Sequence, residues 1–534
     1  MDGIEEDSVG AKAANILYPL LIGQVFGVAV TSITFIIVAR LLGPTSYGIY
    51  TFAFGFSAVV NGFLAFGVGA YLSTNIARLM YKSDYEGVIR AVAAGYVIAG
   101  TASLCLTVLG IGISGYIAGM FARVGVSPDI LMIAAGTIVF SIMTSIAVSA
   151  LIGFSRSGLA ALVNIIVDLI QLSLSVILTL KFGVVGAVSA MLIGYIAGGL
   201  VGGYLVYRAM SRHFRFRIYV PTSSDLMQIA GVTWPLAATN FLNNGVQNLS
   251  IVLLGIYISA SALGNYGVAF KGLALIAMIY STFGSGLLPI FGTAKAMEMG
   301  EKTNRVYNMI INFALMPMLP VIVYVGAMAV PGLHLLVGNN YGAAPYFLSL
   351  IAAGSTIGLF SAYMHQLFIS GSKTKSVLKI NAISGVVQVA LLVALLPKFA
   401  VIGAIAAIFF FGNIIEVVLF AIDAKKHFGL RLETQKLLKL YLCNAFLWII
   451  VFAVYSASGF LLQSVQSPAK DLIELAAGLV VAVLIYPVML IAFRAVDRID
   501  IERMKKATAK LGRISYIFGG FFAYSERIYS AIIR

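Results

Sequence analysis

A stripe of side-chain amides interrupts an apolar run near the middle of the chain. It consists of five residues, Asn240, Asn243, Asn244, Gln247 and Asn248. Spacings of three, four and seven residues place most of them on one face of a helix. Amides both donate and accept hydrogen bonds, so they suit sugar hydroxyls or a water-filled cavity. The alternative is amide packing between helices, and the clustering favours the cavity.

Two basic residues are candidates for binding an anionic group. Lys271 lies inside an apolar run, and the segment 272–279 that follows it is wholly apolar. A charge in hydrocarbon is costly, so we expect Lys271 to face a cavity, although a long stem could instead carry it to the interface. Arg40 ends the first apolar run, where it is either part of a cavity mouth or an interface anchor. Asn61 adds polarity to the second run.

Two carboxylates also fall inside apolar runs. Asp168 lies four residues after Asn164 and is a candidate proton or cation site, with pairing to an interhelical donor as the alternative. Glu416 is a second candidate for ion coupling, with an interfacial or structural role as its alternative. The chemistry of both would be the coupling of an ion to movement of another solute.

The elements that position these residues are transmembrane helices. Hydrophobic residues make up 60% of the chain and charged residues only 10%. Long continuous apolar runs predict helices rather than the alternating strands of a barrel, hence an all-α polytopic membrane protein. The runs predict fourteen helices, at residues 14–40, 47–77, 88–118, 130–153, 158–180, 183–206, 227–257, 263–293, 304–330, 345–370, 376–396, 400–421, 440–463 and 471–493.

The distribution of basic residues orients these helices. The net charge of +15 would favour nucleic acid in a soluble protein, but 29 of the 35 basic residues fall in alternate loops and the tail. This asymmetry places both termini in the cytoplasm of a multi-pass protein of a prokaryotic cell membrane, with no nucleic-acid partner.

The chain contains an internal duplication. At a shift of 216, Gly48-Ile49-Tyr50 falls on Gly264-Asn265-Tyr266, and at 217, Lys181-Phe182-Gly183 falls on Lys398-Phe399-Ala400. Six helices per copy is an even number, so the repeat is parallel, as in many transporters. The predicted parts are a cytoplasmic N-terminus 1–13, a first lobe 14–206, a basic linker 207–226, a second lobe 227–421, two further helices within 440–493 and a basic amphipathic tail 494–534.

The duplication does not preserve the candidate chemistry. Lys271 is matched to Gly55, Asp168 is matched to Gly385, and the amide stripe has no counterpart in the first helix. We therefore expect the repeat to build a common frame and the departures from it to carry the substrate and ion sites.

Catalytic and metal motifs are not found in the sequence. It has no phosphate-binding loop pattern, and its cysteines, Cys105 and Cys443, lie in apolar runs and form no ligand cluster. The outer loops are short and offer few acids. We expect no enzyme activity, no metal and no cofactor.

The segment Arg40-Leu-Leu-Gly-Pro-Thr-Ser-Tyr-Gly-Ile-Tyr50 resembles a motif of the Wzx-like polysaccharide flippases, a family of the multidrug/oligosaccharidyl-lipid/polysaccharide (MOP) exporters. Leu263 to Lys271 resembles the matching motif of the second copy. The resemblance implies a V-shaped pair of six-helix lobes whose first, second, seventh and eighth helices line a central cavity. The substrate site would then include Arg40, Asn61, Asn240, Asn243, Asn244, Gln247 and Lys271.

The function implied is translocation of a lipid-linked oligosaccharide by alternating access. Its partners would be that substrate, membrane lipids and glycan assembly enzymes, with the protein a monomer. Two alternatives stay open: a cation-coupled multidrug antiporter, and a non-transporting scaffold for glycan assembly.

Overall fold

The computed structural model describes the backbone of residues 2–211, 219, 221–274, 287, 291, 301–462, 467–497, 524, 527 and 529. Within these ranges it does not describe the side chains of residues 2–25, 63–66 and 301–303, or ten between 224 and 244, including Asn240, Asn243 and Asn244. The tail predicted to be amphipathic lies almost wholly outside the described residues.

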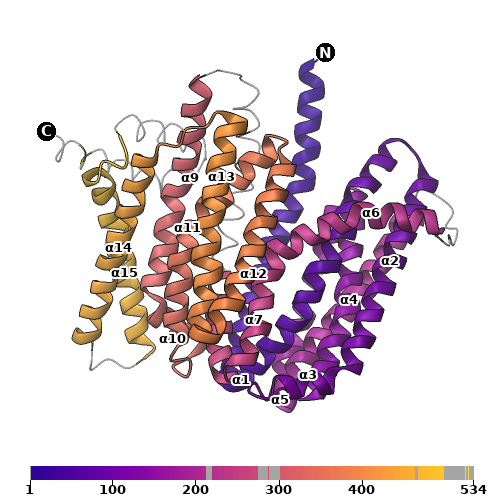
Figure 1. Cartoon of the computed structure of the whole chain (residues 1–534), viewed down its shortest axis with the longest axis horizontal. Helices are drawn as coiled ribbons and strands as arrows, with labels where there is room; N and C mark the ends of the chain where they lie inside the picture. The colour runs from indigo at the N-terminus through magenta and orange to yellow at the C-terminus, as the bar shows by residue number, and fades with distance from the viewer. Residues whose placement is uncertain are drawn as a thin grey trace. The chain divides into compact units, whose positions relative to one another are not determined.

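The described chain is built of helices, with no strand among the described residues. They are α1 (Asp2–Tyr81), α2 (Tyr85–Gly112), α3 (Ser114–Met120), α4 (Pro128–Gly153), α5 (Ser157–Ser211), α6 (Ser223–Asn240), the π-helical η1 (Phe241–Gly245), α7 (Val246–Tyr257), α9 (Glu301–Ala327), α10 (Ala329–Val337), α11 (Ala344–Ser370), α12 (Thr374–Ile405), the π-helical η2 (Ala406–Gly412), α13 (Asn413–Phe428), α14 (Thr434–Leu461) and α15 (Ala469–Ala492) (Figure 1). Residues 260–274 are also helical.

Nine of the described helices are long and apolar enough to cross a membrane. Two of them, 157–211 and 374–428, contain 55 residues each, whereas about 20 suffice for one crossing. Each is broken near its middle, as is α1 at Gly43. The breaks coincide with predicted helix boundaries, so the polytopic all-α class is confirmed. The count of fourteen stays a prediction, because most of the predicted helix 263–293 lies outside the described residues.

The two breaks are equivalent under the duplication. Gly183 has φ 56° and ψ −131°, and Ala400, which lies 217 residues later, has φ 48° and ψ −122°. Three residues beyond each break a glycine meets the facing backbone: a Cβ on Gly186 would lie 2.0 Å from the Leu178 carbonyl oxygen, and one on Gly403 would lie 2.6 Å from that of Leu395. The copies therefore share one hairpin geometry, which supports the predicted repeat.

Ala400 occupies a backbone conformation that favours glycine, so Ala400→Gly is expected to stabilise the protein. Such a conformation costs of order 1–3 kcal/mol, partly offset by the greater freedom of glycine in the unfolded chain. Gly183→Ala is the matched test, since a Cβ there meets no heavy atom within 4 Å and adds only backbone strain. Thermal unfolding in detergent should show opposite shifts for the two variants. A lower unfolding temperature for Ala400→Gly would contradict the assignment.

A second pair of equivalent turns follows α4 and α11. Ser155 (φ 57°) and Ser372 (φ 59°) both adopt a left-handed conformation, 217 residues apart. The amide of Arg156 donates to Leu151 O at 2.8 Å, and that of Lys373 donates to Phe368 O at 2.9 Å. These bonds cap the last carbonyls of each helix in the same way. The duplication thus extends to individual backbone hydrogen bonds.

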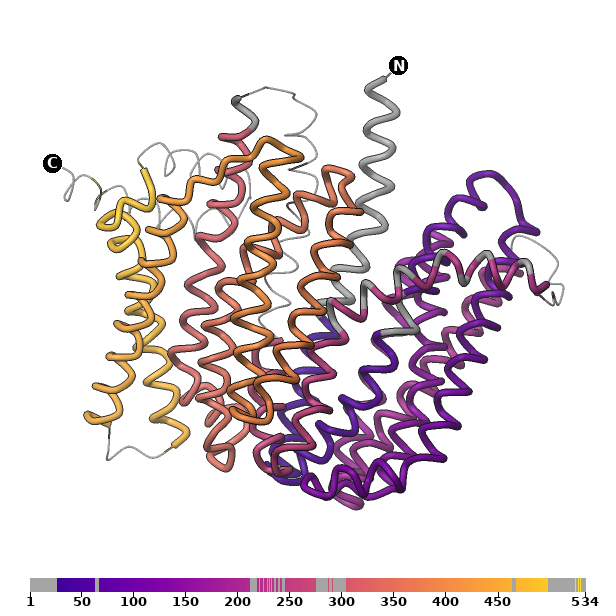
Figure 2. The backbone as a smooth tube through the Cα atoms, viewed as in Figure 1, coloured from indigo at the N-terminus to yellow at the C-terminus, as the bar shows by residue number. Residues whose placement is uncertain are grey.

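The described chain divides into two compact units. One contains residues 1–268 and 389–404, the other residues 269–388 and 405–534. In the first, α2, α4 and α5 run alongside one another (Figure 2), around a core that includes Leu72, Ile138 and Ile142. The division into lobes 14–206 and 227–421 stays a prediction.

The two motif copies cross each other inside the first unit. A Cβ on Gly48 would lie 1.8 Å from the carbonyl oxygen of Ala260, and one on Gly264 would lie 1.9 Å from that of Pro44. Both glycines and both carbonyls are pairs related by the shift of 216, so the contact is reciprocal. Small residues permit such close helix crossings in membranes. The motif shared by the copies therefore has a structural role at this crossing.

The start of α6 is fixed by a capping box. Thr222 accepts a hydrogen bond from the Asp225 amide, and the Asp225 carboxylate accepts one from the Thr222 amide at 2.9 Å. The same carboxylate accepts from the Tyr219 hydroxyl at 2.6 Å. The hydrogen bonds from Tyr219 and then from Thr222 lower the pKa of Asp225 to about 2. The carboxylate is thereby kept charged at the N-terminus of the helix, where negative charge is favoured.

In the second unit, α14 and α15 dock on helices of the duplicated part (Figure 1). The Tyr486 hydroxyl donates to Met316 O at 2.6 Å, and the Tyr324 hydroxyl donates to Leu475 O at 2.7 Å. The Tyr441 hydroxyl donates to Thr356 O at 3.0 Å. These bonds tie the two extra helices to α9 and α11.

Candidate functional site

The predicted cavity residues fall in both units. Arg40 is exposed three residues before the break at Gly43, and Gln247 is half-buried in α7, both in the first unit. Lys271 is half-buried in the helical stretch 260–274 and belongs to the second unit. The described residues do not bring these three together in one site, so a shared cavity stays a proposal.

The amide stripe coincides with a π-helical turn. Asn240 ends α6, and Asn243 and Asn244 lie within η1, whose backbone is wound more widely than an α-helix. Their side chains lie outside the described part. Single π turns occur frequently at functional sites, because they change which face of a helix each residue occupies. The regular spacing used in the sequence analysis therefore does not hold across this segment.

Asn61 makes a specific contact with a neighbouring helix. Its side-chain amide donates to Ser141 Oγ of α4 at 2.7 Å. A hydrogen bond between helices is the packing role expected of an isolated amide in a membrane. A cavity role for Asn61 remains a proposal beside this observed contact.

Asp168 lies on α5 among polar groups of the first unit. The Tyr195 hydroxyl is close enough to interact with its charge, and Gln171 hydrogen bonds to Tyr195. On the other side Gly27 approaches closely, since a Cβ there would lie 2.9 Å from Asp168 Oδ2. No hydrogen bond to the carboxylate is found among the side chains that the structure describes. The group is therefore available to bind a proton or a cation.

Glu416 is held by two serines of neighbouring helices. Ser361 of α11 donates to Oε2 at 3.1 Å, and Ser384 of α12 donates to Oε1 at 3.2 Å. The Gln388 amide in turn donates to Ser384 Oγ at 3.1 Å. A carboxylate that accepts two hydroxyl donors inside a helical bundle is stabilised in one orientation.

The equivalent place in the first copy is occupied by glycine. A Cβ on Gly198 would meet Thr144 at 2.9 Å and Val167 at 2.4 Å, and these two residues match Ser361 and Ser384 at the shift of 217. Gly198 matches Glu416 at a shift of 218, because η2 adds one residue to the helix. The second copy thus gained a carboxylate and two hydroxyls where the first has close apolar packing.

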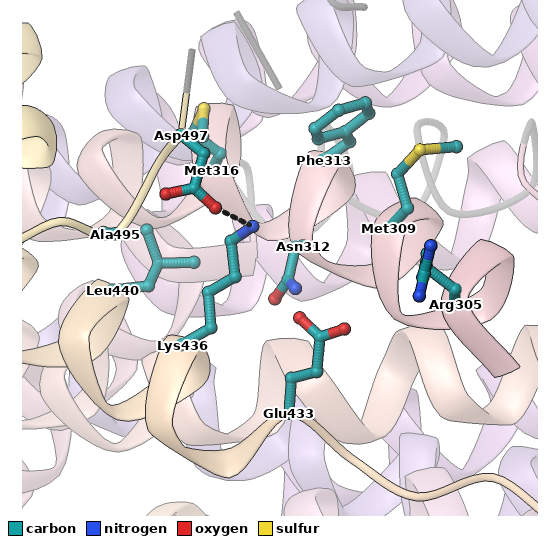
Figure 3. A pocket seen from close by; sticks show the side chains of 10 residues that line it. All are labelled: Arg305, Met309, Asn312, Phe313, Met316, Glu433, Lys436, Leu440, Ala495 and Asp497. Atoms are coloured by element: carbon teal, nitrogen blue, oxygen red, sulfur yellow. Dashed lines mark ion pairs between the residues drawn. The ribbon is translucent and has the colours of Figure 1, made fainter. Parts of the chain in front are cut away.

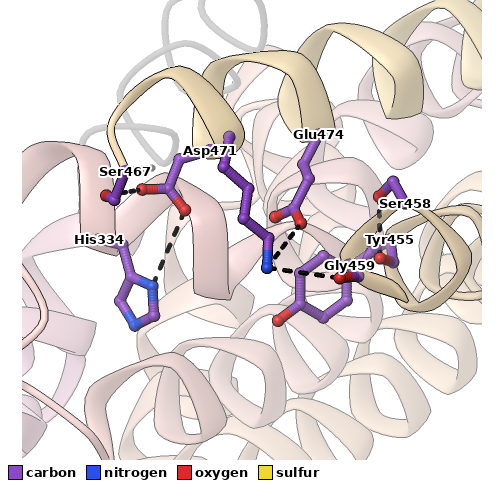
Figure 4. Close-up of polar contacts among 8 residues, drawn as sticks. His334, Tyr455, Ser458, Gly459, Ser467, Asp471 and Glu474 are labelled. Carbon is purple, nitrogen blue, oxygen red and sulfur yellow. Dashed lines mark hydrogen bonds and ion pairs between the residues drawn. The ribbon is translucent and has the colours of Figure 1, made fainter. Parts of the chain in front are cut away.

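A charged cluster that the sequence analysis missed lies at the start of α15. Asp471 and Glu474 are only 5% and 2% exposed. Figure 4 shows the Ser467 hydroxyl donating to Asp471 at 2.7 Å, with His334 Nδ1 3.9 Å from the same carboxylate. Lys470 Nζ lies 3.9 Å from Glu474. The spacing of Lys470 and Glu474, four residues apart on one helix, is the signal that could have indicated this pair.

Metal-binding groups are not found in the described part of the chain. No three His, Cys, Asp or Glu side chains lie close enough to hold a metal ion there. Neither carboxylate, Asp168 or Glu416, has a second acidic or imidazole ligand in such a cluster. Their arrangement suits one proton or a weakly held cation rather than a structural metal.

Comparisons with known proteins place this fold. The solved structure of the lipid II flippase MurJ, in an inward closed conformation, aligns with TM-score 0.66 and 15% identity over 90% of this chain and 98% of that one. An inward-facing multidrug-resistance MATE transporter of the MOP superfamily aligns with TM-score 0.61 and 17% identity over 78% of this chain and 98% of that one.

A MOP superfamily transporter from Pyrococcus furiosus gives TM-score 0.53 and 17% identity over 78% of this chain and 96% of that one. A comparison with curated proteins finds no match. These likenesses define the fold as that of a MOP-type transporter.

The sequence model of the family described as "Polysaccharide biosynthesis protein" matches residues 13–295. The match covers more than half of the 534 residues, so the chain belongs to the polysaccharide biosynthesis protein family. The expected relationship to MOP polysaccharide exporters is confirmed.

Proposed function

We propose that the protein is a flippase that moves a polyisoprenyl-phosphate-linked oligosaccharide across a membrane. The observation that carries the proposal is the family match over residues 13–295. Sugar hydroxyls lose their hydrogen bonds in hydrocarbon, so the head group needs a polar path that the lipid tail does not. Alternating access within a MOP-type fold would supply that path.

The proposed substrate site contains Arg40, Asn61, the amides Asn240, Asn243, Asn244 and Gln247, and Lys271. Lys271 and Arg40 would attract the phosphate, and the amides would bind sugar. The support is chemical: half-buried polar groups on helices of both units, with the amide stripe at a π-helical turn. The site would lie between lobes that rock between inward-open and outward-open states.

Asp168 and Glu416 are proposed to couple translocation to a cation gradient. An ion that binds one conformation better than the other shifts the equilibrium between them by its difference in binding free energy. A multidrug antiporter is the second candidate function, favoured by the likeness to the MATE fold. The MurJ structure aligns with 90% of the chain and the MATE structure with 78%, which favours the flippase.

The proposed setting is the cytoplasmic membrane of a prokaryote, with both termini in the cytoplasm and the protein acting as a monomer beside glycan assembly enzymes. The asymmetry of basic residues supports this orientation. Labelling of single cysteines placed in the loops at Lys82 and Lys470 should give opposite accessibility from outside the cell. Equal accessibility would contradict the orientation.

The deciding experiment is translocation of labelled lipid-linked oligosaccharides by the purified protein in proteoliposomes. We expect transport by the wild type and a fall of roughly tenfold for Lys271→Ala, about the effect of losing one charge-assisted hydrogen bond to phosphate. Lys271→Arg should retain most activity, because the positive charge is kept. Drug transport without sugar-lipid transport would favour the antiporter. Wild-type rates in Lys271→Ala would remove only the role of this residue.

A further inference from the structure

A cavity of about 250 Å³ opens at one end of the second unit, away from the residues proposed for transport. It lies between α9, α14 and the residues that follow α15 (Figure 3). Three apolar spans, 304–327, 434–461 and 469–492, begin or end here. The cavity is therefore at the depth where hydrocarbon gives way to lipid headgroups.

The wall of the cavity carries two positive and two negative side chains. They are Arg305, Lys436, Glu433 and Asp497. Lys436 Nζ lies 3.5 Å from Asp497, and the Asp497 side chain is 69% exposed, so this pair is a weak one that a ligand can replace. The ring of charges is neutral overall, which suits a ligand that bears both signs.

The floor of the cavity is apolar apart from one amide. Leu440 and Met316 are buried, and between them Asn312 is 7% exposed. The Oδ1 atom of Asn312 is buried and receives no hydrogen bond from any described residue. A buried acceptor without a donor costs about 1–3 kcal/mol, so the cavity requires an N–H or O–H donor at this point.

The position of Glu433 is fixed by the backbone around it. Its amide donates to Asn308 Oδ1 at 3.1 Å, and Asn308 Nδ2 donates to Arg431 O at 2.9 Å. The Arg431 amide donates to Asn304 Oδ1 at 2.8 Å. Two asparagines of α9 thus hold the loop that presents the Glu433 carboxylate, and the wall is preformed rather than assembled by a ligand.

We propose that this cavity binds the headgroup of an aminophospholipid. The primary ammonium would donate to Asn312 Oδ1 and Glu433, and the phosphate would pair with Arg305 and Lys436. An anionic headgroup lacks a partner for Glu433 and Asp497. A choline headgroup bears a positive charge but has no N–H to donate. The site would make the stability of the transporter depend on the lipid around it, whether or not the substrate is an oligosaccharide lipid.

The test uses the full-length protein in detergent with lipids of identical acyl chains. Thermal unfolding is measured with phosphatidylethanolamine, its N-methyl and N,N-dimethyl forms, phosphatidylcholine and phosphatidylglycerol. Protection is expected to persist while one N–H remains and to be lost at phosphatidylcholine. Equal protection by phosphatidylcholine or phosphatidylglycerol would overturn the proposal. Soluble glycerophosphoethanolamine is added separately, and protection by it equal to that of the lipid would overturn the membrane as the source.

Two variants locate the effect. Glu433→Gln removes a charge from the exposed rim and keeps the backbone bonds, so it should fold and weaken the apparent affinity for phosphatidylethanolamine by roughly 10- to 100-fold. Asn312→Leu should do the same if it folds. Asp423→Asn is the matched control, since Asp423 pairs with His427 at 3.6 Å in the same unit and does not line the cavity. Unchanged affinity in Glu433→Gln would overturn the site.

Discussion

Replacing Gly48 by alanine is expected to remove most of the correctly folded protein. The added Cβ would lie 1.8 Å from the carbonyl oxygen of Ala260, and a backbone atom cannot rotate away as a side chain can. Overpacking a core costs about 1–3 kcal/mol, and we expect at least the upper end here, because two helices must separate. The measurement is the monodisperse fraction after detergent extraction, together with thermal unfolding.

The reciprocity of the crossing supplies an internal check. Gly264→Ala should have a similar effect, since its Cβ would lie 1.9 Å from the Pro44 carbonyl oxygen. Gly62→Ala on the same helix as Gly48 is the control, because its nearest neighbour would be an ordinary contact at 3.8 Å. Wild-type yield and stability in Gly48→Ala would refute the close crossing.

Replacing Glu416 by glutamine is expected to uncouple transport while leaving the fold intact. Glutamine keeps the shape of the side chain and an acceptor for Ser361 or Ser384, but it cannot take up a proton or hold a cation by charge. Coupling free energies between sites correspond to roughly 5- to 150-fold, and we expect the stimulation by an imposed gradient to fall by that factor. The measurement compares translocation with and without sodium or proton gradients in proteoliposomes.

Two further variants sharpen this experiment. Asp168→Asn tests the carboxylate of the first unit, and the variant with the larger loss identifies the principal ion site. Glu86→Gln is the control, because Glu86 forms an exposed pair with Arg90 at 3.6 Å outside any proposed site. Full gradient dependence in both Glu416→Gln and Asp168→Asn would refute ion coupling through these carboxylates, and translocation itself would still test the flippase.

Much of the helical architecture could be predicted from hydropathy alone, and the errors have a common cause. The predicted helix 345–370 agrees with α11, but the predicted helix 400–421 continues to Phe428, where Gly429 ends it with φ 61°. Hydropathy marks the part of a helix that lies in lipid, whereas backbone hydrogen bonds continue it into water. For the same reason the separate short helices α3 and α10 were not foreseen.

The candidate sites were less accessible to sequence reasoning. Asp168 and Glu416 could be identified as intramembrane charges, but the serines that hold Glu416 come from helices more than thirty residues away along the chain, at 361 and 384. Asn312 gave no signal, because a single amide near a helix end is common. Its importance follows from burial and from the cavity beside it, which only the packed structure defines.

The single extra residue in η2 has an evolutionary consequence. Without it, the register of the second copy would place Ile415, rather than Glu416, opposite Ser361 and Ser384. One inserted codon turns the rest of an α-helix by about 100°, enough to exchange an apolar side chain for a charged one at a fixed point in space. After a gene duplication, such an insertion lets one copy acquire new chemistry in a single step, while the frame inherited from the other stays unchanged.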